Sequence, residues 1–138
     1  MALKNTYSNS PVYQSIEKIE KALVAAGAMG ISKSYDDGKI TGLSFSIKIK
    51  NSEINFKLPV NWKKVQQVLI NENIRVGNGD YYAYRVSWAI LKDWVEAQMA
   101  ILASESVTMP QLFLPYAVAK NGKTLYDSVV DDGLLLLN

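Results

Sequence analysis

Aromatic and cationic side chains gather at the start of a long predicted helix. Tyr81, Tyr82, Tyr84 and Arg85 open this helix, and Arg75 lies a few residues before it. Tyrosine rings stack on bases, a guanidinium binds phosphate through two parallel hydrogen bonds, and the N-terminus of a helix attracts anions. These residue types indicate a site for a small phosphorylated ligand. The structural alternative places Tyr84 in the core and the other tyrosines at an oligomer interface.

Three lysines could extend this basic surface. Lys48, Lys50 and Lys57 alternate with apolar residues along two predicted strands, so they belong to the polar face of a predicted sheet. A few cations suit a small ligand better than a long polyanion, because affinity for a polyanion grows with the number of phosphates neutralised. The alternative is that these lysines only keep one face of the sheet solvated.

Paired carboxylates are the remaining candidates for chemistry. Asp36 and Asp37 stand in the sequence DDGK, which is typical of a solvated hairpin turn. Asp93 and Glu96 lie on one side of the long helix, where two carboxylates could meet a metal ion. The chain has no His and no second carboxylate-rich helix, so we expect neither a metal site nor another cofactor.

Composition excludes several classes of function. The 138 residues include no Cys and no His, which removes disulfides, thiolate nucleophiles, Ser-His triads and imidazole acid–base catalysis. Residues 74–80 contain glycines but neither a GK[ST] nor a GxGxxG motif. No other spacing signals a catalytic mechanism, so we predict that the protein is not an enzyme. The 15 basic and 13 acidic residues are too balanced for a dedicated duplex-DNA binder.

The hydropathy of the sequence indicates the cellular compartment of the protein. No stretch approaches the ~18 apolar residues that a membrane span requires. The first eleven residues, MALKNTYSNSP, lack the apolar core of a signal peptide. The sequence therefore predicts a cytoplasmic protein that does not bind membranes.

The long helix, predicted over residues 81–105, organises the rest of the chain. At about 100° per residue its apolar side chains cover an arc of roughly 200°, wider than a surface helix needs. It must therefore pack against a sheet on one side and against another element or a second subunit on the other. The apolar positions form two neighbouring stripes: Tyr84, Trp88, Leu91, Val95, Met99 and Leu102 in one, and Ile90, Trp94, Ala97 and Ile101 in the other.

The other elements follow from periodicity and turn signals. Ser10 and Pro11 predict the N-cap and first residue of a helix that reaches residue 26. Strands are predicted at residues 29–35, 43–50 and 53–58, and a helix capped by Asn61 follows. After the long helix we predict a helical turn from Thr108, extended backbone from Pro115, a short strand at residues 116–119, a tight turn and a last helix at residues 125–131.

These elements predict an α+β fold in one domain over residues 1–138. It comprises an N-terminal helix, a three-stranded antiparallel meander, a helix, the long central helix and a short C-terminal hairpin and helix. Residues 1–9 are expected to form a loose arm. Four consecutive leucines in the tail, residues 134–138, must dock on the chain's own core or on a second copy. Together with the broad apolar helix, they favour a homo-oligomer.

A family resemblance rests on three stretches: LSFSIKIKNSEINFKLPVNWKKV, AYRVSWAILKDWVEAQMAIL and QLFLPYAVAKNGKTLYD. They resemble an uncharacterised family of small proteins that phages and prophages encode, and the similarity runs from residue 42 to residue 127. Its most specific parts are LPVN at residues 58–61, LPY at residues 114–116, and Arg85, Trp88, Lys92, Asp93, Trp94, Glu96 and Gln98 in the long helix. The resemblance implies a phage or prophage origin. It carries no activity to individual residues.

Three functions remain open. The first is a non-enzymatic phage accessory protein that counteracts host defence by sequestering a small nucleotide-type signal, with Arg75, Tyr81, Tyr82 and Arg85 at the ligand. The second is a single-strand nucleic-acid-binding accessory of phage recombination or replication, which the lysine face would serve. The third is a protein–protein inhibitor or structural adaptor.

Overall fold

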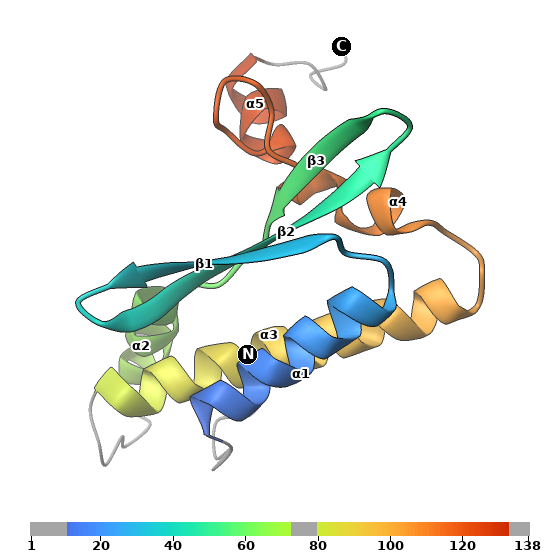
Figure 1. The fold of residues 1–138 in the computed structure, drawn as a ribbon. Helices are drawn as coiled ribbons and strands as arrows, with labels where there is room; N and C mark the ends of the chain where they lie inside the picture. The colour runs from blue at the N-terminus through green and yellow to red at the C-terminus, as the bar shows by residue number, and fades with distance from the viewer. Residues whose placement is uncertain (1–10, 73–79, 133–138) are drawn as a thin grey trace.

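The structure is a computed structural model that describes residues 11–72 and 80–132, with its two longest helices packed on one face of a small sheet (Figure 1). The elements in order are α1 (Val12–Ala25), β1 (Gly30–Asp36), β2 (Lys39–Ile49), β3 (Ser52–Lys57), α2 (Trp62–Asn71), α3 (Asp80–Ala103), α4 (Met109–Phe113), the 3-10 helix η1 (Leu114–Tyr116) and α5 (Leu125–Asp132). This order confirms the predicted α+β fold. The predicted arm at residues 1–9 and the leucine tail lie outside the described residues.

The sheet is an antiparallel meander with β2 in the centre. Asp37 and Gly38 connect β1 to β2 with φ angles of 51° and 78°, the positive values that a tight two-residue hairpin turn requires. The DDGK acids therefore form a hairpin turn, as predicted. Phe45 lies opposite Phe56 across β2 and β3, and their stacked rings have centroids 5.1 Å apart. These two rings mark the apolar face of the sheet.

Helices α1 and α3 run side by side beneath this apolar face (Figure 1). Trp88 of α3 is fully buried between the sheet and the helix layer. The second support that the wide apolar arc of α3 requires comes from α1 and α2 of the same chain. The buried core draws on α1, β2, β3, α3 and α4; its members include Ile16, Ile19, Leu23, Leu43, Phe45, Phe56, Tyr84, Trp88, Leu91, Val95 and Phe113.

Capping residues fix where the shorter helices begin. Asn61 caps α2 as predicted, because its Oδ1 accepts a hydrogen bond from the backbone N–H of Lys64 at 3.2 Å. Thr108 and Gln111 form a reciprocal capping box at the start of α4. That box directs Phe113 into the core. At the N-terminus the prediction was one residue early, because Pro11 has extended backbone and is the N-cap of α1 rather than its first residue.

The C-terminal segment, residues 114–132, differs from the prediction. Pro115 lies in η1 instead of starting extended backbone, because the φ of proline also suits the first positions of a helix. The predicted strand at residues 116–119 is reduced to two isolated bridges, Phe56 with Ala117 and Val118 with Thr124. The N–H of Val118 donates to the carbonyl of Asn55 at 2.8 Å. The segment therefore extends the edge of β3 and places α5 beyond it (Figure 1).

Candidate functional site

The predicted tyrosine–arginine cluster exists on the first turns of α3. The Arg85 guanidinium carbon lies 5.9 Å from the ring centroid of Tyr81 and 5.2 Å from that of Tyr82. Helical spacing explains this contact, because residues three and four apart share a helix face. Arg75 lies outside the described residues. The structure thus brings three of the four predicted residues together, and the role of Arg75 stays a prediction.

The cluster does not line any of the four recesses described below. Arg85 stacks on two rings of its own helix, and its Nε is buried without a hydrogen-bond partner. Tyr84 points the other way, is buried, and donates from its hydroxyl to the Ile40 carbonyl at 2.7 Å. Tyr84 is therefore a core residue, which was the structural alternative.

The three predicted lysines are exposed, but Lys57 lies well apart from Lys48. Lys48 lies opposite Glu53 and Lys57 lies opposite Ser44 in the β2–β3 pairing. At about 3.3 Å per residue, four positions separate Lys48 from Lys57 by roughly 13 Å along the strands. Lys50 lies in the turn beyond β2, with φ of 56°. This face of the sheet carries few positive charges, and Glu53 lies opposite one of them. It should therefore bind a long polyanion only weakly.

The two carboxylates of α3, Asp93 and Glu96, pair with a lysine of the same helix. Lys92 Nζ lies 3.1 Å from Asp93 Oδ1 and 3.8 Å from Glu96 Oε1. Among the described residues, no three His, Cys, Asp or Glu side chains are grouped as a metal ion would require. These carboxylates form a helix-surface ion pair.

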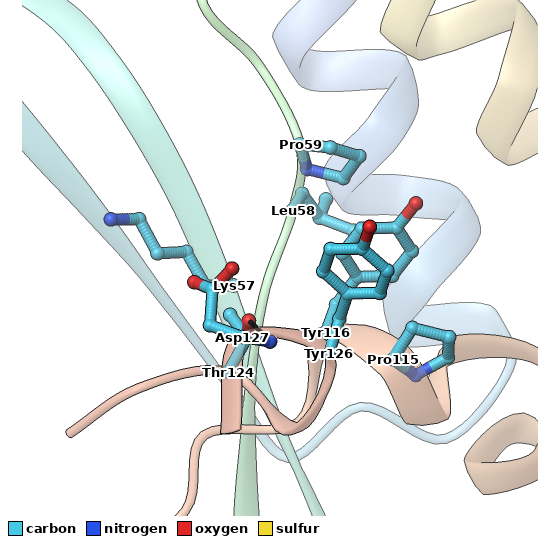
Figure 2. Close-up of a pocket in the computed structure, with 8 residues that line it drawn as sticks. All are labelled: Lys57, Leu58, Pro59, Pro115, Tyr116, Thr124, Tyr126 and Asp127. Atoms are coloured by element: carbon cyan, nitrogen blue, oxygen red, sulfur yellow. Dashed lines mark hydrogen bonds between the residues drawn. The ribbon is translucent and has the colours of Figure 1, made fainter. Parts of the chain in front are cut away.

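The most ligand-like feature is a recess that the sequence did not place. It has a volume of about 410 Å³ and lies between the end of β3 and the C-terminal segment (Figure 2). Small-molecule sites commonly begin at about 300 Å³. Its lining combines two prolines, two tyrosines and two opposite charges: Pro59, Pro115, Tyr116, Tyr126, Lys57 and Asp127.

A second recess adjoins the first. It measures about 250 Å³, lies between α2 and α3, and shares Pro59 and Tyr116 with the first. Its other walls include Val60, Ile90 and Trp94. We call the two together the tyrosine–proline groove, defined by Lys57, Pro59, Val60, Ile90, Trp94, Pro115, Tyr116, Tyr126 and Asp127. A polar end at Lys57 and Asp127 thus leads into an apolar end between two helices.

Ring contacts anchor one wall of the groove in the core. Tyr116 meets Trp94 edge to face at 5.6 Å, Trp94 meets Phe113 at 5.6 Å, and Phe113 meets Phe45 at 5.2 Å. Such aromatic pairs favour fixed geometry. Tyr116 is therefore held in place before any ligand arrives.

The other wall comes from α5 and is more exposed. Tyr126 is 61% exposed, although it has an aromatic ring. Thr124 accepts a hydrogen bond from the N–H of Asp127 at 3.3 Å, which starts α5, and the N–H of Leu125 donates to the Ala117 carbonyl at 2.7 Å. These bonds place Tyr126 and Asp127 on the groove side of the helix (Figure 2).

The groove has two charged side chains, Lys57 and Asp127. Neither Lys57 nor Asp127 takes part in an ion pair with another described residue. In Figure 2 the Lys57 side chain extends away from the two tyrosine rings. In that view Asp127 lies between the Lys57 ammonium and the rings. A ligand that reached from ring to ammonium would thus pass the carboxylate on its way.

One sequence signal pointed to this groove. The motifs LPVN and LPY, which are among the most specific parts of the family resemblance, supply Pro59, Val60, Pro115 and Tyr116. Residues 58–61 and 114–116 are far apart in sequence, and the bridge between Phe56 and Ala117 helps to bring them together. Sequence reasoning missed the groove because that contact is not local.

Comparisons of the chain with protein-family models, with curated proteins and with solved structures each find no match. Within the described part of the chain, no helix is both long and apolar enough to cross a membrane. Function is therefore inferred from the chemistry of the groove and of the surfaces around it.

Proposed function

We propose that the protein is a non-enzymatic binding protein that takes a small nucleotide-type ligand in the tyrosine–proline groove. The observation that carries this proposal is the combination of an exposed tyrosine, a carboxylate and an ammonium in one recess of ligand size, where neither charged group forms an ion pair with another described residue. Each group matches a different part of a nucleotide. The site differs from the one that the sequence predicted on α3.

The order of the groups supports a nucleotide over other small ligands. A base would stack on the exposed face of Tyr126, as bases do on aromatic side chains. Asp127 could accept hydrogen bonds from ribose hydroxyls, a role that carboxylates fill in dinucleotide-binding proteins. Lys57 could bind a phosphate as a point charge. Base, ribose and phosphate then follow the order of Tyr126, Asp127 and Lys57 across the recess (Figure 2).

The proposed role is sequestration of a host defence signal by a phage protein. Its support is the resemblance to phage and prophage proteins together with the groove. A sequestering protein needs a site that closes around its ligand and no catalytic group. Single-strand nucleic-acid binding is less well supported, because Glu53 faces Lys48 and Lys57 lies roughly 13 Å from Lys48 along the strands.

Calorimetric titration against cyclic nucleotides, nucleoside monophosphates and ADP-ribose derivatives tests the proposal. We expect heat of binding with at least one of them. Tyr126→Ala should weaken that binding at least about tenfold, since stacking contributes about 1–3 kcal/mol per base. Tyr35→Ala is the matched control, because Tyr35 is 64% exposed on β1, away from the groove. Lys57→Gln should also weaken binding, with Lys48→Gln as its control.

Two results would overturn the proposal. One is the absence of any heat of binding with every ligand of the panel at millimolar concentration. The other is binding that Tyr35→Ala weakens as much as Tyr126→Ala does, because the contact would then lie outside the groove.

We also propose a homo-oligomer, which a third recess supports. This recess is an apolar groove of about 300 Å³ between the ends of α1 and α3. Its lining includes Ala22 and Ala25 of α1, Ala26 directly after α1, and Met99 and Leu102 of α3. Val24 and Ile101, from the same ends of the two helices, are 59% and 45% exposed. Small residues let a second helix approach closely. Light scattering should therefore show a mass above that of one chain, and Ala25→Glu should return the protein to the monomer mass.

A further inference from the structure

A separate apolar recess lies between the β2–β3 hairpin and the C-terminal segment. It measures about 420 Å³, and the side chains around it include Ile49, Ile54, Leu114, Val118 and Leu125. Ser52 is the one side chain with a polar group among those that line it. Leu114 is 48% exposed beside it. Apolar surface of this kind in water normally has an occupant.

The chain carries a matching occupant close by. Residues 134–137 are four consecutive leucines, and they follow directly on α5, which ends at Asp132. The start of α5, Leu125, is part of the wall of the recess. Both the recess and the four leucines need an apolar partner, and α5, which begins at one wall of the recess, leads directly to the leucines.

The distances allow the tail to return. From Leu125 to Asp132 the helix rises about 10 Å at 1.5 Å per residue. Residues 133–137 can span about 17 Å when extended. Gly133 stands where the chain would have to reverse, and glycine adopts the required positive φ without strain. The leucines can therefore reach back past the start of α5.

We propose that residues 134–137 dock into this recess within the same chain. The docked tail covers Leu114 and closes the gap between the β2–β3 hairpin and the C-terminal segment. It also adds a second support to α5, whose packing among the described elements is chiefly against η1. The tail thereby fixes the helix that carries Tyr126. Ligand binding in the tyrosine–proline groove is not needed for this docking.

The absence of native cysteine makes a disulfide test clean. Leu136→Cys is combined with Ala119→Cys, whose position lines the recess, and the pair is exposed to a mild oxidant that joins two nearby thiols. The control pairs Leu136→Cys with Tyr126→Cys. Position 126 is closer in sequence to 136 and is 61% exposed, so random motion of the tail would favour the control pair.

We expect the 119–136 pair to form an intramolecular disulfide at least about ten times faster than the 126–136 pair, because docking raises the local concentration of the tail at the recess. Equal rates, or a faster control, would overturn the proposal. A product of twice the chain mass would also overturn it, because the tail would then occupy a second copy.

A second measurement covers the case in which the double variant does not fold. The single variant Leu136→Cys is labelled with a maleimide in native buffer and in urea. Docking predicts labelling at least about tenfold slower in native buffer, beyond the effect of urea on an exposed control cysteine at Tyr13. Adding Leu135→Asp should abolish that protection. Labelling as fast as at the control position would refute docking.

Discussion

The hydroxyl of Tyr84 offers a direct test of how the long helix is joined to the sheet. Its ring is 6% exposed in the core, and its O–H donates to the carbonyl of Ile40 in β2 at 2.7 Å. Tyr84→Phe keeps the ring and removes only this bond. A single hydrogen bond of this kind contributes about 0.5–1.5 kcal/mol to the free energy of unfolding. For a chain of this length that loss lowers the Tm by roughly 4 °C.

The same residue predicts a pH dependence. Burial, the largest cause, raises the pKa of the Tyr84 hydroxyl above its ordinary value. The folded state therefore holds this proton more tightly than the unfolded state does. The stabilisation is fully present below the unfolded pKa of about 10 and is lost as the pH rises through the folded pKa. Tyr84→Phe removes this contribution, so its stability should fall less steeply above about pH 10.

Urea denaturation at neutral and alkaline pH measures both effects. Tyr13→Phe is the control, because Tyr13 is 68% exposed on α1 and should leave the free energy of unfolding unchanged. Lys33, whose pKa is raised by its hydrogen bond with Glu20, adds to the alkaline loss in every variant, so the difference between variants is the quantity to compare. If Tyr84→Phe and Tyr13→Phe unfold alike at both pH values, the bond between α3 and β2 does not form in solution.

Three further perturbations test the core, a turn and an ion pair. Phe113→Ala should lower the free energy of unfolding by about 3–5 kcal/mol, because this fully buried ring from α4 completes the core; chemical denaturation measures it. Gly38→Ala should cost about 1 kcal/mol, since nothing lies within 4 Å of an added Cβ and only the positive φ of 78° opposes it; thermal melting reports the loss. Lys33 and Glu20, 2.6 Å apart, join β1 to α1, and a double-mutant cycle with Lys33→Met and Glu20→Gln should give a coupling of about 0.5–1 kcal/mol that falls with added salt.

Local signals in the sequence predicted most of the fold. Alternating residues located the strands, and the turn at Asp37 and Gly38 and the cap at Asn61 lie where they were predicted. The start of β2 was predicted too late, because the strand begins at Lys39 and not at residue 43. Pro115 was misread because proline suits both extended backbone and the first turn of a helix. The short-range sequence offered no way to choose between them. In the structure the 3-10 turn at Pro115 accompanies the packing of Tyr116 against Trp94, a contact between distant parts of the chain.

The site was harder to predict than the fold for a physical reason. Tyr81, Tyr82 and Arg85 could be grouped from sequence because helical spacing places them on one face. That same spacing lets the arginine stack on its own helix, and the cluster lines none of the four recesses formed by the described residues. A recess needs walls from elements that meet at an angle. Here those walls are β3, α3 and the C-terminal segment, and sequence periodicity says nothing about their meeting.

The way the C-terminal segment attaches unites the groove and the apolar recess. Neighbouring residues of this segment belong to different recesses: Pro115 and Tyr116 line the groove, whereas Leu114 and Ala117 line the apolar recess. The bridge between Ala117 and Phe56 joins the segment to the sheet edge, and the N–H of Val118 donates to the carbonyl of Asn55 there. Anything that fills the apolar recess must therefore hold the same backbone that carries one wall of the groove. A substitution that weakens docking of the leucine tail should consequently also lower the ligand affinity of the groove. Substitutions in the tyrosine–arginine cluster on α3 should change neither quantity.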